Sequence, residues 1–352
     1  MKTTQRRRML PISAAVFCLV TAILPAHAET PNYHLVRTIS LPTDDGWDYI
    51  YADGDSHRLY VSRGTHVQVV DTEKGTLAGD IPGVNGVHGV AIDKKTGRGF
   101  ISDGRSNSVT IFDLKSLQKI GADVPVDNDP DCIIFDPSTK RVFTFNGDSA
   151  TSTAIDAKTG AVVGHVTLDG GPEYSVPDGH GHIYNNVADK SEVEEIDSKS
   201  LKVTRVWPIA PGNSPSGIAM DTASRRTFSV CRNQTMVVLD TDTGKVVATP
   251  AIGAGSDACA FDPKSKLVFS PNGRDGTLTV IHEDSPDKYT TVATLTTQVG
   301  ARTMALDTDT GHIFLATAKI LPPDPNAPPP APGQRARRRF APGSFVILEF
   351  AP

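Results

Sequence analysis

The chain has 352 residues, with 35 Lys and Arg against 40 Asp and Glu, and a formal net charge of −5. Its 38% apolar and 21% charged residues are typical of a soluble globular protein. These values exclude a multi-span membrane protein, a disordered polyanion and a strongly basic nucleic-acid-binding protein. The 30 Gly and 26 Pro residues supply many turns, which favours a fold of many short strands.

The first 28 residues have the three parts of a secretory signal peptide. Residues 2–8 carry Lys and Arg, residues 9–24 are apolar but too short to span a bilayer comfortably, and residues 26–28 read Ala-His-Ala. We expect cleavage after Ala28, a mature chain without a transmembrane segment, and a periplasmic or secreted location. Arg6-Arg7-Arg8 also fits a loose twin-arginine pattern, which leaves export in the folded state open.

The remaining chain contains seven copies of one pattern, in which a short apolar strand ends in an Asp. These residues follow one another at intervals of 40–45 positions: Asp53, Asp93, Asp136, Asp178, Asp221, Asp262 and Asp307. A basic or His residue then opens a second strand, and a third strand usually ends in another Asp. Four short antiparallel strands at this period form one blade of a β-propeller.

We therefore predict an all-β, seven-bladed propeller of four-stranded antiparallel blades over residues 33–350. Its blade cores should begin near residues 47, 87, 130, 172, 215, 256 and 301. The last repeat lacks a fourth strand, so we expect residues 33–41 to pair with residues 345–350 and close the ring. The repeated Asp should accept hydrogen bonds from turn N–H groups rather than act as a catalytic acid. We expect a monomer.

The repeats resemble the YVTN β-propeller repeat family, also called YncE-like. The resemblance rests on the sevenfold strand-Asp-turn-Arg-aromatic pattern, and Leu59-Tyr60-Val61-Ser62 is the segment most similar to the motif that names the family. It covers nearly the whole mature chain and implies the propeller fold. It implies no catalytic residues, because such propellers include enzymes, adhesion modules and binding proteins. No motif matches those of propeller lactonases or lyases residue by residue.

Residues that open the inner strands should surround one mouth of the central channel. They are Asp48, His88, Asp131, Glu173, Ser216, Asp257 and Arg302. The sequence allows two interpretations, a divalent-metal or polar-ligand site and a channel lined by solvated polar groups. A metal such as Ca²⁺, Mn²⁺ or Zn²⁺ would take its ligands from Asp48, His88, Asp131, Glu173 and Asp257. Trp47, Tyr49 and Tyr174 flank this ring and are expected to pack between blades or to stack on a planar ligand.

Basic residues follow the second strand in six of the seven repeats. We expect them to form a basic rim around the mouth: Arg63, Arg105, Lys190, Arg232, Arg274 and Lys319. Such a rim on an acidic protein favours an anionic glycan or an acidic protein as partner, with ordinary exposed turns as the alternative.

A Pro-rich insertion occupies residues 321–344 of the last repeat and contains a second basic cluster. The cluster consists of Arg335, Arg337, Arg338 and Arg339. It is interpreted either as a surface insertion or as a docking peptide for an anionic surface. Nucleic acid is not favoured, because few aromatic side chains are nearby for base stacking.

Three functions remain open from these residues. The first is an exported binding or scaffold protein, and the second is a metal-assisted hydrolase or lyase, lactonase-like, that uses the channel ring. The third is an accessory protein of a periplasmic redox system. The absence of G-x-S-x-G, H-E-x-x-H and C-x-x-C motifs favours binding over catalysis. Cys231 and Cys259 lie in neighbouring repeats and could form a disulfide, which would leave Cys132 free.

Overall fold

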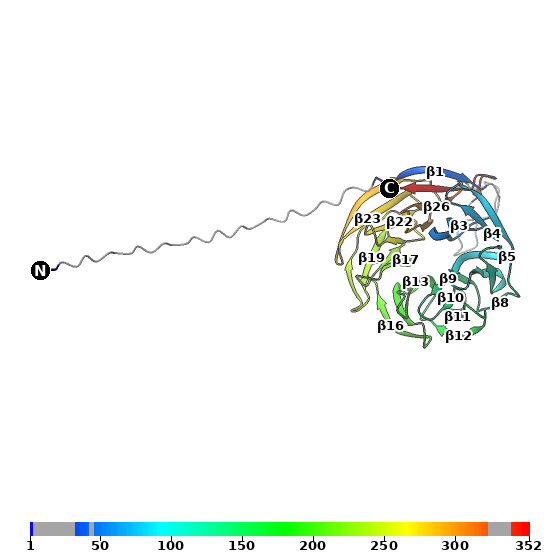
Figure 1. Ribbon diagram of the computed structural model, residues 1–352, viewed down its shortest axis with the longest axis horizontal. Helices are drawn as coiled ribbons and strands as arrows, with labels where there is room; N and C mark the ends of the chain where they lie inside the picture. The colour runs from blue at the N-terminus through cyan, green and yellow to red at the C-terminus, as the bar shows by residue number, and fades with distance from the viewer. Residues whose placement is uncertain (3–31, 42–45, 323–338) are drawn as a thin grey trace.

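The structure is a computed structural model that describes residues 1–2, 32–41, 46–322 and 339–352. These residues form β-strands and two short 3₁₀ helices, η1 (Gly54–Ser56) and η2 (Gly104–Ser106). The strands make antiparallel sheets around a central axis, as the end-on view of Figure 1 shows. The predicted all-β propeller arrangement is confirmed. No helix in this part of the chain is long and apolar enough to cross a membrane. The predicted signal peptide lies outside the described residues, apart from its first two.

Repeats three to six each form one four-stranded sheet whose strands follow chain order. The third repeat supplies β9 (Pro130–Asp136), β10 (Arg141–Asn146), β11 (Thr151–Asp156) and β12 (Val162–Thr167). The fourth supplies β13 (Pro172–Pro177), β14 (His182–Val187), β15 (Glu192–Asp197) and β16 (Lys202–Pro208). The fifth supplies β17 (Pro215–Asp221), β18 (Arg226–Cys231), β19 (Thr235–Asp240) and β20 (Lys245–Ala248). The sixth supplies β21 (Ala260–Asp262), β22 (Leu267–Asn272), β23 (Thr277–Ser285) and β24 (Lys288–Thr296).

The fifth four-stranded sheet joins the two ends of the chain, as predicted from the missing strand of the last repeat. Its order is β1 (His34–Ser40), β29 (Val346–Ala351), β26 (Ile313–Thr317) and β25 (Thr303–Leu306). The pairing of β1 with β29 runs from His34 opposite Ala351 to Ser40 opposite Val346. A separate two-stranded hairpin, β27 (Ile320–Leu321) and β28 (Arg339–Phe340), stands at the base of the Pro-rich insertion.

The first two repeats form one seven-stranded sheet instead of two separate blades. Its strands are β2 (Ile50–Asp53), β3 (Arg58–Ser62), β4 (Gly64–Asp71), β5 (Thr76–Asp93), β6 (Arg98–Asp103), β7 (Ser108–Asp113) and β8 (Val124–Pro125). The prediction of seven separate four-stranded blades is therefore wrong, because the described residues form five such sheets and this larger one.

The 18-residue strand β5 explains the merger of the first two repeats. Its first part pairs with β4, as Ile81 with Val67, and its second part pairs with β6, as Ala91 with Phe100. Between them Gly83 and Gly86 have left-handed backbones, with φ of 82° and 72°. Glycine adopts such angles without a steric penalty, so the strand changes direction here without ending.

The seven repeated Asp residues have the turn-forming role expected of them. All are at most 5% exposed. In six of the seven the carboxylate accepts a hydrogen bond from the N–H two positions later, as Asp136 does from Ser138 at 3.0 Å and Asp221 from Ala223 at 2.9 Å. In these six repeats the carboxylate thus holds the turn that leads to the second strand, and in the first repeat Asp53 instead accepts from the Ser56 hydroxyl at 2.6 Å.

Candidate functional site at the channel mouth

The inner-strand openings converge as the sequence predicted, and five of the seven form one chain of alternating charges. The imidazole of His88 lies between Asp48, at 2.7 Å, and Asp131, at 2.9 Å. The guanidinium of Arg302 lies between Asp48, at 3.3 Å, and Asp257, at 3.1 Å. These residues come from five different repeats, so the contacts join the sheets around the mouth.

The two carboxylates beside His88 stabilise its charged form. Burial opposes the charge, but hydrogen bonds with Asp131 and Asp48 raise the pKa of His88 to about 10. The Nε2 atom of the same ring lies 3.6 Å from Asp129, a third carboxylate. His88 is therefore an imidazolium at neutral pH, held between acidic groups on both sides of its ring.

The surroundings of Glu173 and Asp257 disfavour the charged form of these groups, whereas those of His88 favour its charged form. Burial, together with the charges of Asp257 and Asp131, raises the pKa of Glu173 to about 8. Burial also raises the pKa of Asp257, to about 6, although the charge of Arg302 opposes this. At neutral pH the Glu173 carboxyl group is mainly protonated, so it can donate a hydrogen bond to a bound group.

A cavity of about 130 Å³ opens beside this part of the ring. Glu173, Ser216, Asp257 and Arg302 line it, so the remaining two predicted ring residues lie at the same mouth. Two residues of the predicted basic rim, Arg232 and Arg274, also line it. The sequence predicted a central ring of mainly acidic residues and a basic rim around it. The structure brings residues of both to one cavity.

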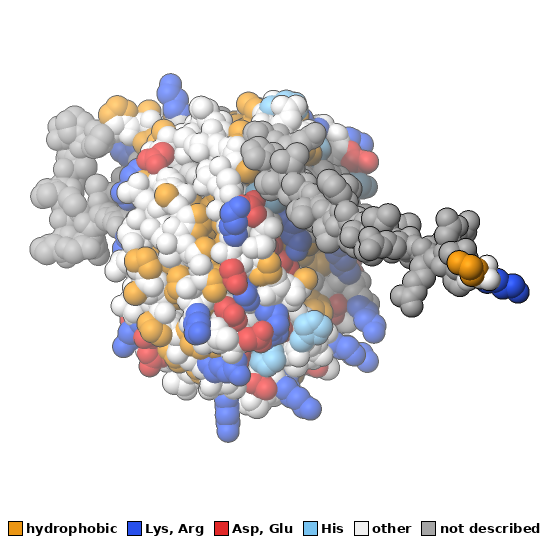
Figure 2. Space-filling model, turned by 90° about the vertical axis from the view of Figure 1, so that its left-hand side faces the viewer, with side chains coloured by type: hydrophobic (Ala, Val, Ile, Leu, Met, Phe, Trp, Pro, Cys, Tyr) orange, Lys and Arg blue, Asp and Glu red, His pale blue; other side chains and the backbone are white. Residues whose placement is uncertain are grey.

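Five of the six predicted rim residues are exposed, and the sixth is buried. The exposed residues are Arg105, Lys190, Arg232, Arg274 and Lys319. Arg63 is fully buried, and its guanidinium lies over the Phe345 ring at 3.7 Å from the centroid. The prediction that Arg63 belongs to an exposed rim is wrong, because a cation–π contact with the last sheet draws its side chain inward. On the outer wall of the molecule acidic and basic side chains lie interspersed (Figure 2).

Tyr49 and Tyr174 come from the first and fourth repeats, yet their ring centroids lie 4.8 Å apart. Trp47 packs on Phe345 and Phe340 at 5.1 and 4.7 Å, which agrees with the expected packing role for this residue. The tyrosine pair lies next to the charged ring, because Tyr49 follows Asp48 and Tyr174 follows Glu173 in the chain.

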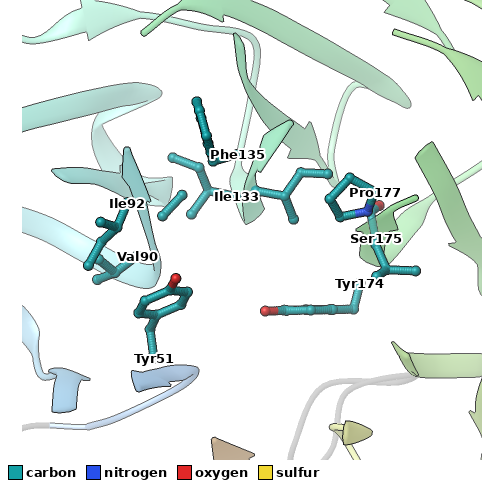
Figure 3. Close-up of a pocket in the computed structure, with 11 residues that line it drawn as sticks. Tyr51, Val90, Ile92, Ile133, Phe135, Tyr174, Ser175 and Pro177 are labelled. Atoms are coloured by element: carbon teal, nitrogen blue, oxygen red, sulfur yellow. The ribbon is translucent and has the colours of Figure 1, made fainter. Parts of the chain in front are cut away.

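Beyond the tyrosine pair, farther along the inner strands, the structure contains an apolar cavity of about 270 Å³ that sequence reasoning missed. Figure 3 shows the side chains of Tyr51 and Tyr174 at its edge, with Val90, Ile133 and Phe135 on its wall. The available signal was the alternation along the inner strands, which places an apolar residue two positions after six of the seven polar openings, with Ser175 as the exception.

Most of the predicted basic cluster lies outside the described residues, since these omit Arg335, Arg337 and Arg338. Arg339 is exposed at the start of β28. The three described cysteines are free, so Cys231 and Cys259 form no disulfide in this structure. Burial raises the pKa of all three thiols.

Comparison with known proteins supports the fold. The sequence matches no model of a known protein family and no curated protein. The solved structure of Kuenenia stuttgartiensis hydrazine synthase is similar with a TM-score of 0.68 and 18% identity, over 79% of this chain and 94% of that one. The structure of U3-55K is similar with a TM-score of 0.73 and 10% identity, over 90% of this chain and 98% of that one. At such identities the similarity shows a shared propeller fold alone.

Proposed function

We propose that this protein is a binding propeller that holds a small anionic ligand in the cavity at its channel mouth. The fold is consistent with a binding or scaffold role.

We further propose that the seven-stranded sheet acts as two blades joined at residues 83–86. We also propose that the chain is a YVTN-type repeat protein that acts outside the cytoplasm. The seven repeats and the first 28 residues support these statements.

The observation that carries the proposal is the pair of guanidinium groups at the cavity. Arg302 is neutralised by Asp48 and Asp257. Arg232 and Arg274 line the same cavity, and neither forms a salt bridge among the described residues. A guanidinium presents parallel N–H donors that match a carboxylate or a phosphate, so two of them at one cavity favour an anionic group.

The other polar groups of the cavity suit the same ligand. Protonated Glu173 can donate a hydrogen bond, and the Ser216 hydroxyl lies on the same wall. A cavity of about 130 Å³ accepts a small molecule or the end of a longer one. The carboxylate or phosphate of an anionic glycan is the kind of group that paired guanidinium groups bind.

Calorimetric titration of the full chain tests the proposal with glucuronate and glucose 6-phosphate, against glucose as the neutral comparison. We expect the two anions to bind and glucose to bind at least tenfold more weakly. The double variant Arg232→Ala, Arg274→Ala should weaken anion binding at least about 100-fold, because charged hydrogen bonds contribute about 1.5–3 kcal/mol each.

The matched control is the double variant Arg105→Ala, Lys190→Ala. It replaces two exposed rim cations that do not line the cavity. It removes the same charge and should leave the affinity within about twofold at moderate salt. Equal weakening by both double variants would show non-specific attraction and contradict the proposal, as would the failure of both anions to bind.

A further inference from the structure

Three side chains from three repeats bring metal-binding atoms to one point of the channel mouth. One ligand atom from each of Asp48, His88 and Asp131 lies within 4.8 Å of the other two. His88 Nδ1 is 2.7 Å from Asp48 Oδ2 and 2.9 Å from Asp131 Oδ1. Two donors that bind one ion at about 2.0–2.2 Å and at right angles lie about 3 Å apart. The spacing of the three side chains therefore fits one coordination sphere with little movement.

Neighbouring groups hold the backbone of these residues in place, and some also contact the side chains, as the neighbours of metal ligands do. The Asp48 N–H donates to the Ser62 hydroxyl at 2.8 Å, and its carbonyl accepts from Thr303 at 2.9 Å. Its second carboxylate oxygen lies 3.3 Å from Arg302.

Asp131 and His88 are positioned in a similar way. The Asp131 carbonyl accepts from the Ser102 hydroxyl at 3.2 Å. The Asp129 carboxylate lies 3.6 Å from His88 Nε2, the ring nitrogen that points away from the other two ligands. A carboxylate hydrogen-bonded to the far nitrogen orients a metal-binding imidazole, and a movement of about 0.4 Å would bring Asp129 to that distance.

The three side chains are accessible from the mouth, with 18%, 28% and 23% of Asp48, His88 and Asp131 exposed. An ion could enter without rearrangement of the sheets. Three protein ligands leave positions for water or for a bound molecule, as in sites where a metal meets a ligand rather than only supporting a fold.

We propose that Asp48, His88 and Asp131 bind one divalent first-row transition-metal ion, of the class of Zn²⁺ and Mn²⁺. One imidazole nitrogen with two carboxylate oxygens suits these ions better than Ca²⁺, which prefers six to eight oxygens. The two carboxylates balance the charge of the ion, and the imidazole binds in its neutral form, with its proton released to solvent. The proposal goes beyond the anion site, since Arg232 and Arg274 are not ligands.

Calorimetry on the full chain, freed of metal by a chelator, tests the site with ZnCl₂, MnCl₂ and CaCl₂ alone. We expect one equivalent of Zn²⁺ or Mn²⁺ to bind, with Ca²⁺ at least tenfold weaker. Asp131→Asn and His88→Ala should each weaken binding at least 100-fold. His165→Ala is the matched control: His165 Nδ1 lies 3.0 Å from Asp127, a comparable His–Asp pair, and the affinity should not change.

Two further measurements separate the possible results. The Arg232→Ala, Arg274→Ala double variant should keep its metal affinity, so a failed anion site leaves this proposal standing. Co²⁺ bound to the unsubstituted chain should show visible absorption bands and a shifted imidazole proton resonance, which identifies a histidine ligand even if a variant fails to fold. Absence of stoichiometric binding, or unchanged affinity in folded Asp131→Asn and His88→Ala, would show that the cluster is an ion-pair network alone.

Discussion

Tyr49 and Tyr174 meet across the central channel at a centroid distance of 4.8 Å, with their ring planes inclined by 57°. Their contact places an aromatic layer between the charged mouth and the apolar cavity farther along the inner strands. Burial, reinforced for both rings by the Asp131 carboxylate, raises the pKa of both phenols. The pair links sheets that are not neighbours in the ring. Because both phenols are neutral, the contact should contribute to stability through packing rather than through charge.

We expect Tyr174→Ala to lower the free energy of unfolding by about 3 kcal/mol, the lower end of the usual cost of removing a large aromatic ring, because Tyr174 is only partly buried. Tyr174→Phe keeps the ring and should cost less than about 1.5 kcal/mol. Urea unfolding followed by circular dichroism measures both. Similar losses in the two variants would mean that the hydroxyl, and not the ring contact, stabilises the channel.

The ring closure depends on a buried carboxylate, Glu349, which is 1% exposed. Arg37 on β1 lies 2.6 Å from one of its oxygens, and His312, directly before β26, lies 2.7 Å from the other. Arg37→Ala should destabilise the protein by about 2 kcal/mol, because a buried charge loses one partner. Thermal and urea unfolding measure the loss. Lys74→Ala breaks the exposed pair with Asp71 and should leave stability nearly unchanged; equal effects would argue against a special role for the closure.

The protonation of Glu173 predicts a pH dependence of stability. Its pKa is raised from 4.5 to about 8, so between these values the folded state holds a proton that the unfolded state has released. Stability should therefore fall as the pH rises from 4.5 to 8. Glu173→Gln removes this contribution, and its unfolding free energy should change less over the same range. Parallel stability curves for the two proteins would contradict the raised pKa.

The free thiols give a direct test of the covalent structure. Cys132, Cys231 and Cys259 should all react with a thiol reagent in denaturant without prior reduction, because none is bonded to another. In the native protein the reaction should be slow, since burial raises each thiol pKa and lowers the thiolate population. A Cys231–Cys259 disulfide would remove two of these reactive groups.

The placement of the ring residues could be predicted because it depends on local order alone. An Asp ends each inner strand, and the residue five positions before it opens the strand, so Asp131 and Glu173 could be identified without knowledge of any long-range contact. The pairing of residues 33–41 with the last strand followed from counting strands, since a three-stranded blade leaves an unpaired edge.

What could not be predicted depends on distances between repeats. Arg63 follows its strand as Arg105 does, but Phe345, from the other end of the chain, draws it into the interior. Gly83 and Gly86 lie between the first two repeats, and only the backbone shows that the strand continues through them. The contact of Tyr49 with Tyr174 depends on the width of the channel, which no single repeat encodes.

The pairing of β1 with β29 has a consequence for how the molecule is made. Arg37 is translated 312 positions before Glu349, its partner in the closing sheet. Because a ribosome releases the chain in order of its sequence, β1 must remain without its neighbour until β29 has been translated. Contacts so distant in the chain form slowly, so this sheet should close after the sheets whose strands are consecutive in the chain.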